Sequence, residues 1–363
     1  GPTTTCATSY RFDINGAQTN RCLHDLGSTT GTNCMKPGTR PSHKPRPRHV
    51  YLVMTDDPTL FFDRLRPRLH GIAYRMLGSV ADAEELVQDV WLRWHEADAD
   101  TIDNAEAWLV TVTTRLAIDR LRRAQTERAH YVGFWLPEPW ADVDTLPLAP
   151  HVETPATPEA LLERADDLSM AFLTVLERLG PEARAAFLLR EVFDADYADV
   201  ASALGKSEAA CRQIVSRAKA QLHSGIRRNS VSPETHLRLL EGFADAARRG
   251  DFAALQGLLA EDAELISDGG GVVPSFGKVL TGAARIAQLY YAGWRRHVRG
   301  DAALRLELAR INGEWGLLRF VDGQLDSAQT LQTDGQRIVR IHTQRNPHKL
   351  ARLAAAWAAA HPD

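Results

Sequence analysis

The sequence has few cysteines and no long apolar stretch. Its four cysteines are Cys6, Cys22 and Cys34 near the start and Cys211 much later. None forms a Cys-x-x-Cys pair. A disulfide framework is not expected in a cytoplasmic protein, and a metal site built from the first three cysteines is the alternative. No apolar run approaches the roughly 20 residues that cross a bilayer, and the first residues do not resemble a signal peptide. We therefore expect a cytoplasmic protein with no membrane partner, metal or cofactor.

The chain also lacks a strong excess of charge of either sign. Its net charge is −3 over 363 residues. This value averages segments of opposite sign, so it does not exclude nucleic acid as a partner. The length suits two or three domains, and an apolar content of 44% is enough for ordinary cores.

Residues 1–53 differ from the rest in composition. They are polar, lack helical or strand periodicity, and end in a cluster of proline, arginine, histidine and lysine. Gly1 and Pro2 resemble the remnant of a protease site, whereas Met54 comes just before the first amphipathic segment. We expect a disordered, non-native or upstream leader. The alternative is a basic arm that binds DNA.

Residues 54–128 predict a helical domain. A helix over 58–77 ends at Gly78, and two helices of opposite charge follow, over about 81–96 and 105–123. The acidic helix has an inward stripe of Leu86, Val90 and Trp94. The basic helix is expected to bury Trp108, Leu109, Val112 and Leu116. The charges indicate either two solvated faces, or an acidic surface for a protein partner beside a basic surface for nucleic acid.

The run RMLGSVADAEELVQDVWLRW, followed by AWLVTVTTRLAIDRLRR, resembles region 2 of the extracytoplasmic-function (ECF) sigma factors. In that family the acidic helix docks on the clamp of RNA polymerase core, and the next helix reads and helps to open the promoter −10 element. The resemblance implies polymerase contacts from Asp82, Glu85, Asp89 and Trp94. It implies contacts to double-stranded promoter DNA and the melted −10 strand from Thr114, Arg115, Arg122 and Arg123.

Residues 129–157 form a linker rich in proline and aromatic residues. Pro137, Pro139 and Pro147 exclude a continuous helix and favour an extended path. Trp135 and Trp140 would be an apolar liability in solvent, so packing against the first domain is the plain expectation. The stretch Trp135, Leu136, Pro137, Glu138 and Pro139 (WLPEP) resembles the linker signature of one ECF group, which carries a fused C-terminal SnoaL-like domain.

Residues 158–228 predict a second helical domain that ends in a helix-turn-helix. Helices over 158–179 and 182–192 lead to a support helix over 197–204, Gly205 allows the turn, and Ser207 caps the recognition helix. That helix should bury Cys211, Ile214, Ala218 and Leu222, with the cysteine as a small core residue. Its other face offers side chains that reach base edges and phosphates. The unit resembles sigma region 4, which implies −35 contacts from Ser207, Arg212, Gln213, Ser216, Arg217 and Lys219.

Residues 231–363 predict helices followed by strands separated by Asn-Gly and Asp-Gly turns. We expect an α+β cone with a curved antiparallel sheet, which resembles the SnoaL-like, nuclear-transport-factor-2 (NTF2) superfamily. Enzymes occur in that superfamily, and a general base would be a carboxylate or histidine facing an apolar cavity. Asp268, His297 and His342 are candidates by type, but no acid/base pair is evident. We expect no catalysis, and a small-molecule ligand of this domain stays open.

Two motifs of this tail resemble those of the same ECF group. Asp268, Gly269, Gly270 and Gly271 match a DGGGK motif in which Val272 replaces the lysine, and Asn346, Pro347, Lys349 and Leu350 match an NPxKL motif. Asn346 should cap, and Pro347 begin, a last helix with Leu350, Leu353 and Trp357 on one side. We expect both motifs to contact the WLPEP stretch. In the family such a tail controls the sigma factor in cis, in place of a separate anti-sigma protein.

The sequence therefore predicts two all-α sigma domains followed by an α+β SnoaL/NTF2-like cone. The predicted function is that of an alternative sigma factor which binds RNA polymerase core and recognises −10 and −35 elements. The alternative is a polymerase-independent helix-turn-helix regulator with a ligand-sensing or catalytic tail.

Overall fold

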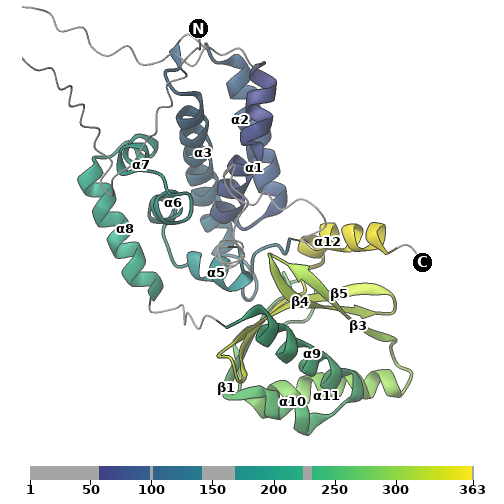
Figure 1. Cartoon of the computed structure of the whole chain (residues 1–363). Helices are drawn as coiled ribbons and strands as arrows, with labels where there is room; N and C mark the ends of the chain where they lie inside the picture. Colours follow the sequence, from purple (N-terminus) through teal and green to yellow (C-terminus); the bar gives the residue numbers. More distant parts are fainter. Residues whose placement is uncertain (1–56, 99–100, 141–167, 224–230, 362–363) are drawn as a thin grey trace, which may run out of the picture. The chain divides into compact units, whose positions relative to one another are not determined.

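The computed structural model describes residues 57–98, 101–140, 168–223 and 231–361 (Figure 1). The expectations for the leader, for residues 158–167 and for Pro147 lie outside these ranges. The first three helices are α1 (Pro58–Leu77), α2 (Val80–Glu96) and α3 (Ala105–Arg128). Each begins at a residue whose side chain accepts a bond from a backbone N–H of the first turn, namely Asp57, Ser79 and Asn104.

The third helix, α3, is longer than expected, and its buried face is wider than predicted, with Leu109 buried as expected. It continues to Arg128, and Trp108, Val112 and Leu116 are only half-buried. Thr113 and Thr114 are buried instead, because each hydroxyl donates to a backbone carbonyl one turn earlier, at 2.8 and 2.7 Å. Both threonines are therefore compatible with an apolar core.

The second helical unit comprises α5 (Met170–Leu176), α6 (Pro181–Phe187), the π-helical turn η2 (Leu188–Val192), α7 (Tyr197–Leu204) and α8 (Glu208–His223). The expected continuous helix to Leu179 is wrong at residues 168–169, since Ser169 caps α5 by accepting from Phe172 N at 3.1 Å. The expected helix over 182–192 is divided into α6 and η2.

The helix-turn-helix is as predicted in its bounds. Gly205 has φ 63°, the left-handed conformation that suits glycine at a helix end, and Ser207 Oγ accepts from Ala210 N. Val215 takes the buried place expected for Ile214 in α8, whereas Cys211 is buried as predicted, which raises the pKa of its thiol.

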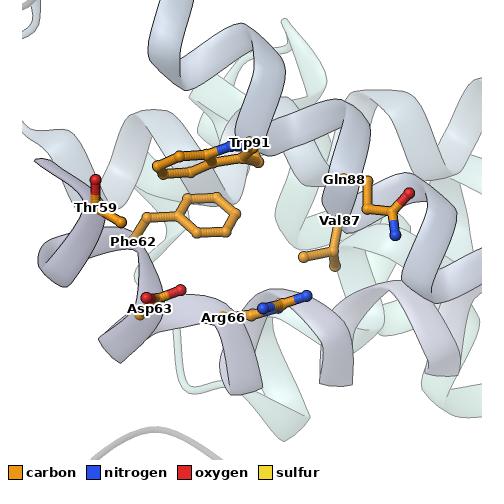
Figure 2. Close-up of a pocket in the computed structure, with 7 residues that line it drawn as sticks. All are labelled: Thr59, Phe62, Asp63, Arg66, Val87, Gln88 and Trp91. Atoms are coloured by element: carbon orange, nitrogen blue, oxygen red, sulfur yellow. The ribbon is translucent and has the colours of Figure 1, made fainter.

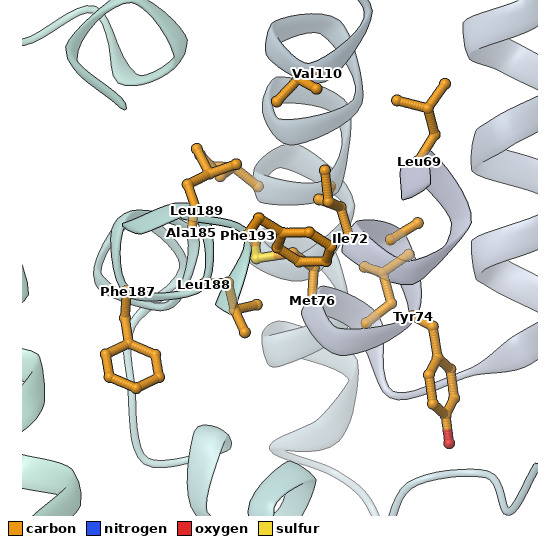
Figure 3. Packing of buried hydrophobic residues seen from close by; sticks show 14 of the residues in the cluster. Leu69, Ile72, Tyr74, Met76, Val110, Ala185, Phe187, Leu188, Leu189 and Phe193 are labelled. Atoms are coloured by element: carbon orange, nitrogen blue, oxygen red, sulfur yellow. The ribbon is translucent and has the colours of Figure 1, made fainter. Parts of the chain in front are cut away.

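One hydrophobic core joins the two helical units. Figure 3 shows Ile72 and Met76 of α1 beside Leu188, Leu189 and Phe193 of the second unit. Since α3 also packs against α6 and α7, the helices of the two sigma-like units form a shared apolar interior.

The tail begins with α9 (Pro233–Arg249) and α10 (Phe252–Leu258), followed by strand β1 (Leu259–Asp268), the short β2 (Leu280–Thr281) and α11 (Ala283–Val298). Strands β3 (Leu304–Ile311), β4 (Glu314–Val321), β5 (Gln324–Thr333) and β6 (Ile338–Gln344) follow, and α12 (Pro347–Ala360) is last. The sheet order is β2-β1-β6-β5-β4-β3.

The sheet is mixed, so the expectation of a wholly antiparallel sheet is wrong. Strands β1 and β6 pair in parallel, and the other neighbours are antiparallel. Parallel neighbours need a long connection, and here the chain passes through α11 and the β3–β5 meander before it returns beside β1. Helices α9–α11 supply one core of the tail, whereas Leu350 and Leu353 of α12 pack with Leu318 and Phe320 in another. Among the described helices, none has the length and apolar character to cross a membrane.

Candidate regulatory and nucleic-acid interface

The carboxylate of Asp268, at the end of β1, is the point where the linker and the tail meet. It is fully buried. A buried carboxylate is stable only when its oxygens are hydrogen-bonded, and here both are. Oδ1 accepts from the Tyr131 hydroxyl (2.6 Å) and from Gly270 N (2.9 Å). Oδ2 accepts from Leu136 N (2.9 Å), Gln344 Nε2 (3.2 Å) and Lys349 Nζ (2.7 Å).

Lys349 supplies the positive charge at this carboxylate. Its ammonium also donates to the Leu136 carbonyl at 2.7 Å and lies 4.2 Å from the ring centre of Trp135. Burial lowers the pKa of Lys349 to about 8, although Asp268 opposes this shift. The tail motif therefore holds the linker through a buried ion pair and a cation–π contact.

The glycines after Asp268 leave space for this arrangement. Gly270 has φ 64°, and a Cβ there would overlap the side-chain amide of Asn346. Asn346 Oδ1 accepts from His348 N at 3.0 Å, which confirms the predicted cap of α12. Val272, at the lysine position of the motif, is exposed, so it takes no part in the contact.

The glutamate of the linker binds the start of the acidic helix α2. Glu138 is buried, and its Oε2 accepts from Val80 N (2.7 Å), Ala81 N (3.4 Å) and Ser79 Oγ (3.2 Å). An anion is favoured at a helix N-terminus, whose first N–H groups have no partner in the helix. Desolvation raises the pKa of Glu138, and the bonds from α2 oppose this. The WLPEP stretch therefore packs on the first domain, as expected, and contacts the tail as well.

A residue that the sequence reading missed, Asn312, joins three segments. It is fully buried at the turn between β3 and β4, with φ 55°. Its Nδ2 donates to the Tyr74 hydroxyl (2.6 Å) and the Leu168 carbonyl (3.1 Å). Its Oδ1 accepts from Trp140 N at 3.0 Å, and its own N–H donates to the Trp140 carbonyl at 2.9 Å. The Asn-Gly pair at 312–313 was the available signal, but it indicated only a turn.

The acidic face of α2 carries most of the expected polymerase-binding residues. Asp82 and Glu85 are exposed, and Asp89 forms an ion pair of 2.5 Å with Arg120. Trp94 is not on this face. It is buried against Phe61 and Trp108, and its indole N–H donates to the Pro58 carbonyl at 3.1 Å, so the expected polymerase contact through its side chain is wrong for this conformation.

A hollow of about 250 Å³ lies between α1 and α2. Phe62 and Trp91 form its apolar wall, and Asp63, Arg66 and Gln88 supply polar groups (Figure 2). The exposed Leu92 is next to Trp91 in the sequence. This surface extends the acidic face of α2 with an apolar part that the sequence reading did not assign.

The expected −10 residues differ in their surroundings: two bind other parts of the protein, one faces solvent and one is buried. Arg115 donates to the carbonyls of Ser202 (2.8 Å) and Ala203 (3.0 Å) in α7, and Arg122 forms an ion pair of 2.8 Å with Glu182. Arg123 is exposed. Thr114 is fully buried, so the expected DNA contact through its side chain is wrong for this conformation.

The loop before α3 borders a second hollow, of about 340 Å³. Asn104 and Trp108 line it together with Arg115 and with Ser202 of α7. The helix-turn-helix unit therefore forms part of the wall of a hollow in the expected −10 region.

The expected −35 residues share one side of α8. Arg212, Gln213, Ser216, Arg217 and Lys219 are all exposed, and Ser207 is exposed at the helix start. Arg212 forms an ion pair of 2.8 Å with Glu208, and Lys219 forms one of 2.6 Å with Glu191. Such exposed pairs are worth about 0–1 kcal/mol, so they do not prevent these side chains from turning to DNA.

Comparisons with known proteins cover both helical units and the tail. The family model Sigma-70 region 2 matches residues 61–127, and Sigma-70, region 4 matches residues 169–222. The ECF RNA polymerase sigma factor SigJ of Mycobacterium tuberculosis is 34% identical over 304 residues, which are 83% of this chain and 91% of SigJ. This chain belongs to the ECF sigma factors.

Further matches agree with this assignment. The probable ECF RNA polymerase sigma factor SigI of M. tuberculosis is 29% identical over 292 residues, 80% of this chain and 93% of SigI. The crystal structure of M. tuberculosis SigJ matches with a TM-score of 0.61 and 30% identity, and it covers 81% of this chain and 98% of the other. The predicted function as a sigma factor, which directs promoter recognition by RNA polymerase, and the predicted fold of two helical sigma domains plus a tail of helices and sheet are thus confirmed.

Of the three candidate general bases of this sigma factor, two are engaged in hydrogen bonds and the third is buried. Asp268 is saturated with hydrogen bonds, and the exposed His297 accepts from Leu304 N at 3.0 Å. His342 is buried in β6, where desolvation lowers its pKa to about 3. Neither of the two described hollows is lined by these residues. Among the described residues, no group of three or more metal-ligand side chains gathers either.

The burial of His342 predicts that the free energy of unfolding falls in acid. Its pKa is about 6.5 when unfolded and about 3 when folded, so the unfolded chain binds the extra proton as the pH falls below 6.5. Stability from the neutral imidazole is thus fully present above pH 6.5 and is lost toward pH 3. We expect His342→Gln to reduce the slope of unfolding free energy against pH in this window by about 1.4 kcal/mol per unit. Urea unfolding at several pH values measures this, and equal slopes would contradict it.

Proposed function

We propose that the tail of this sigma factor controls in cis its engagement with RNA polymerase core and promoter DNA. In the active complex, the acidic face of α2 (Asp82, Glu85, Asp89) binds core. Arg115, Arg122 and Arg123 then bind −10 DNA, and the exposed side of α8 binds the −35 element through Arg212, Gln213, Ser216, Arg217 and Lys219.

The observation that carries this proposal is the position of Arg115. Its guanidinium donates to two carbonyls of α7, in the region 4 unit, at 2.8 and 3.0 Å. These bonds occupy Nε and Nη2, which form one of the edges through which arginine binds phosphate, so a phosphate bound at that edge has to displace the two carbonyls. The ion pair of Arg122 with Glu182 adds a second such conflict. Engagement of −10 DNA by these residues therefore competes with the contacts that hold region 4 against α3.

The tail stabilises the conformation in which these conflicts exist. Asn312 links Tyr74 of region 2 to Leu168, just before α5, and Asp268 and Lys349 hold the linker at Leu136. Opening the two sigma domains would break these hydrogen bonds, each of which contributes a net free energy of about 0.5–1.5 kcal/mol. The fraction of protein able to bind core and promoter is reduced by that cost.

The last helix also lies on the surface proposed to dock on polymerase. Arg352 of α12 forms a bidentate ion pair with Glu84, which is in α2 between Asp82 and Glu85. Core binding at this face competes with α12. Since both side chains are half-exposed, the pair contributes about 0.2–1 kcal/mol, which is a small part of the control.

Reversing the charge of Arg352 tests the proposal. Arg352→Glu places a carboxylate beside Glu84, so we expect the affinity for purified core to rise by about two- to fivefold, from the loss of the pair. Promoter-dependent transcription at limiting sigma factor should rise with it. Arg248→Glu is the control, because Arg248 pairs with Asp245 within the tail.

Two results would count against the proposal. If Arg352→Glu and the control bind core equally, α12 does not compete for α2. If core is not stimulated by any variant, while the protein alone binds specific DNA tightly, the helix-turn-helix acts without polymerase.

A further inference from the structure

Helix α11 of the tail has an unusually basic exposed face. Its buried side is formed by Ala283, Ile286, Ala287 and Tyr290. Arg285, Arg295 and Arg296 lie on the exposed side, and Arg299 follows directly after the helix end and is also exposed. The helix, AARIAQLYYAGWRRHV, contains no acidic residue. Charges of one sign therefore accumulate along this face.

None of these four arginine side chains is in an ion pair or hydrogen bond with the described residues. Other arginines of the tail are neutralised. Arg340 pairs with Glu264 at 2.5 Å, Arg345 pairs with Asp326 at 2.8 Å, and Arg248 pairs with Asp245 at 2.9 Å. The α11 face is thus left without a counter-charge within the described part of the domain.

Helix stability explains only part of the pattern. Cations in a last turn favour a helix through its dipole, which accounts for Arg295, Arg296 and Arg299. Arg285 is in the first turn, where the dipole disfavours a cation. A partner with negative charge along the whole face would stabilise all four.

The chemistry of the face separates nucleic acid from protein as that partner. Protein interfaces depend on aromatic or apolar anchors in a desolvated centre. The aromatic residues of α11 pack against other rings of the tail. The ring centres of Tyr291 and Phe252 are 6.3 Å apart, and Trp294 stacks on Tyr291 with ring centres 5.4 Å apart. Two apolar side chains of α11, Leu289 and Val298, are also exposed, but they do not form a desolvated centre. Exposed guanidinium groups suit phosphates, which arginine binds with a fork of N–H groups.

We propose that the exposed face of α11 binds the phosphate backbone of double-stranded DNA. The contact is independent of sequence, and it goes beyond the −10 and −35 contacts of the sigma domains. It gives the tail a role in holding DNA in addition to its role in restraining the sigma domains. Each arginine that neutralises a phosphate should contribute to the salt dependence of binding.

The test is the binding of full-length protein to a fluorescent duplex that lacks any promoter, measured by anisotropy over a range of salt concentrations. For Arg295→Gln/Arg296→Gln/Arg299→Gln, the slope of log K against log salt should become shallower by about 2.7, since each lost phosphate contact contributes about 0.9. Arg285→Gln should reduce it by about 0.9 without weakening the helix, so it remains informative if the triple variant unfolds. The control is Arg248→Gln/Arg249→Gln, whose arginines both pair with Asp245.

Slopes equal to that of the unchanged protein in both α11 variants would overturn the proposal. An equally large reduction of the slope in the control variant would also overturn it, because the effect would then reflect net charge. Polyglutamate that competes with the duplex at equal affinity would reassign the face to an acidic protein surface. An arginine-dependent slope with no effect of polyglutamate supports DNA.

Discussion

Replacing Asn312 by alanine is expected to lower the free energy of unfolding by about 3–5 kcal/mol. The side chain is fully buried and bonds Tyr74, Trp140 and Leu168. Its loss leaves buried polar groups without partners, at about 1–3 kcal/mol each. Alanine at φ 55° adds backbone strain of about 1 kcal/mol or more. Chemical denaturation of the two proteins measures the difference.

Two further variants separate these causes. Asn312→Gly removes the side chain, but glycine adopts this backbone conformation without strain. Its free energy of unfolding should therefore exceed that of Asn312→Ala by the strain contribution. Asp322→Ala introduces alanine at a similar φ, 51°, in the exposed turn after β4. If Asn312→Ala costs no more than Asp322→Ala, the hydrogen bonds of Asn312 do not join the domains as described.

Replacing Asp268 by alanine is the second change with a large expected effect. The carboxylate is fully buried and is the partner of Lys349, whose side chain is nearly buried. Removal of one member of a buried pair leaves the other charge uncompensated, which costs about 3–5 kcal/mol. The bonds of Tyr131, Leu136 and Gln344 are lost as well. Denaturant unfolding of full-length protein measures the loss.

A charge-matched double variant checks this explanation. Asp268→Ala/Lys349→Met removes both charges and keeps an apolar chain over Trp135, so it should be more stable than Asp268→Ala alone. A double variant less stable than either single variant would mean that the buried ion pair is not the source of the effect.

The local elements of this chain were predictable because local signals fix them. The bounds of α1 and α7 match the expectation, since Pro58 and Gly78 begin and end one helix and Gly205 ends the other. The cap at Asn346 was equally readable. In contrast, the parallel pairing of β1 with β6 depends on where a distant strand returns, and no local pattern carries that information.

The site was predictable in its motifs but not in its contacts. Resemblance indicated that Asp268, Lys349 and the linker act together, and they do form one buried network. It did not indicate that Glu138 caps α2 or that Asn312 reaches Tyr74, because both contacts join segments far apart in the sequence. Thr114 and Trp94 were assigned to surfaces by position in a motif, whereas core packing places both inside.

Promoter-dependent transcription by purified RNA polymerase core tests the central claim most directly. The comparison is between the full chain and Asp268→Asn, which keeps the shape of the side chain and weakens its hold on Lys349, at limiting sigma factor. If the weaker contact between tail and linker shifts the equilibrium toward the form with separated sigma domains by about 1.4 kcal/mol, transcript yield rises about tenfold. Equal yields from the two proteins, with both folded, would contradict control by the tail, and no stimulation of core by either would contradict the proposed engagement of polymerase.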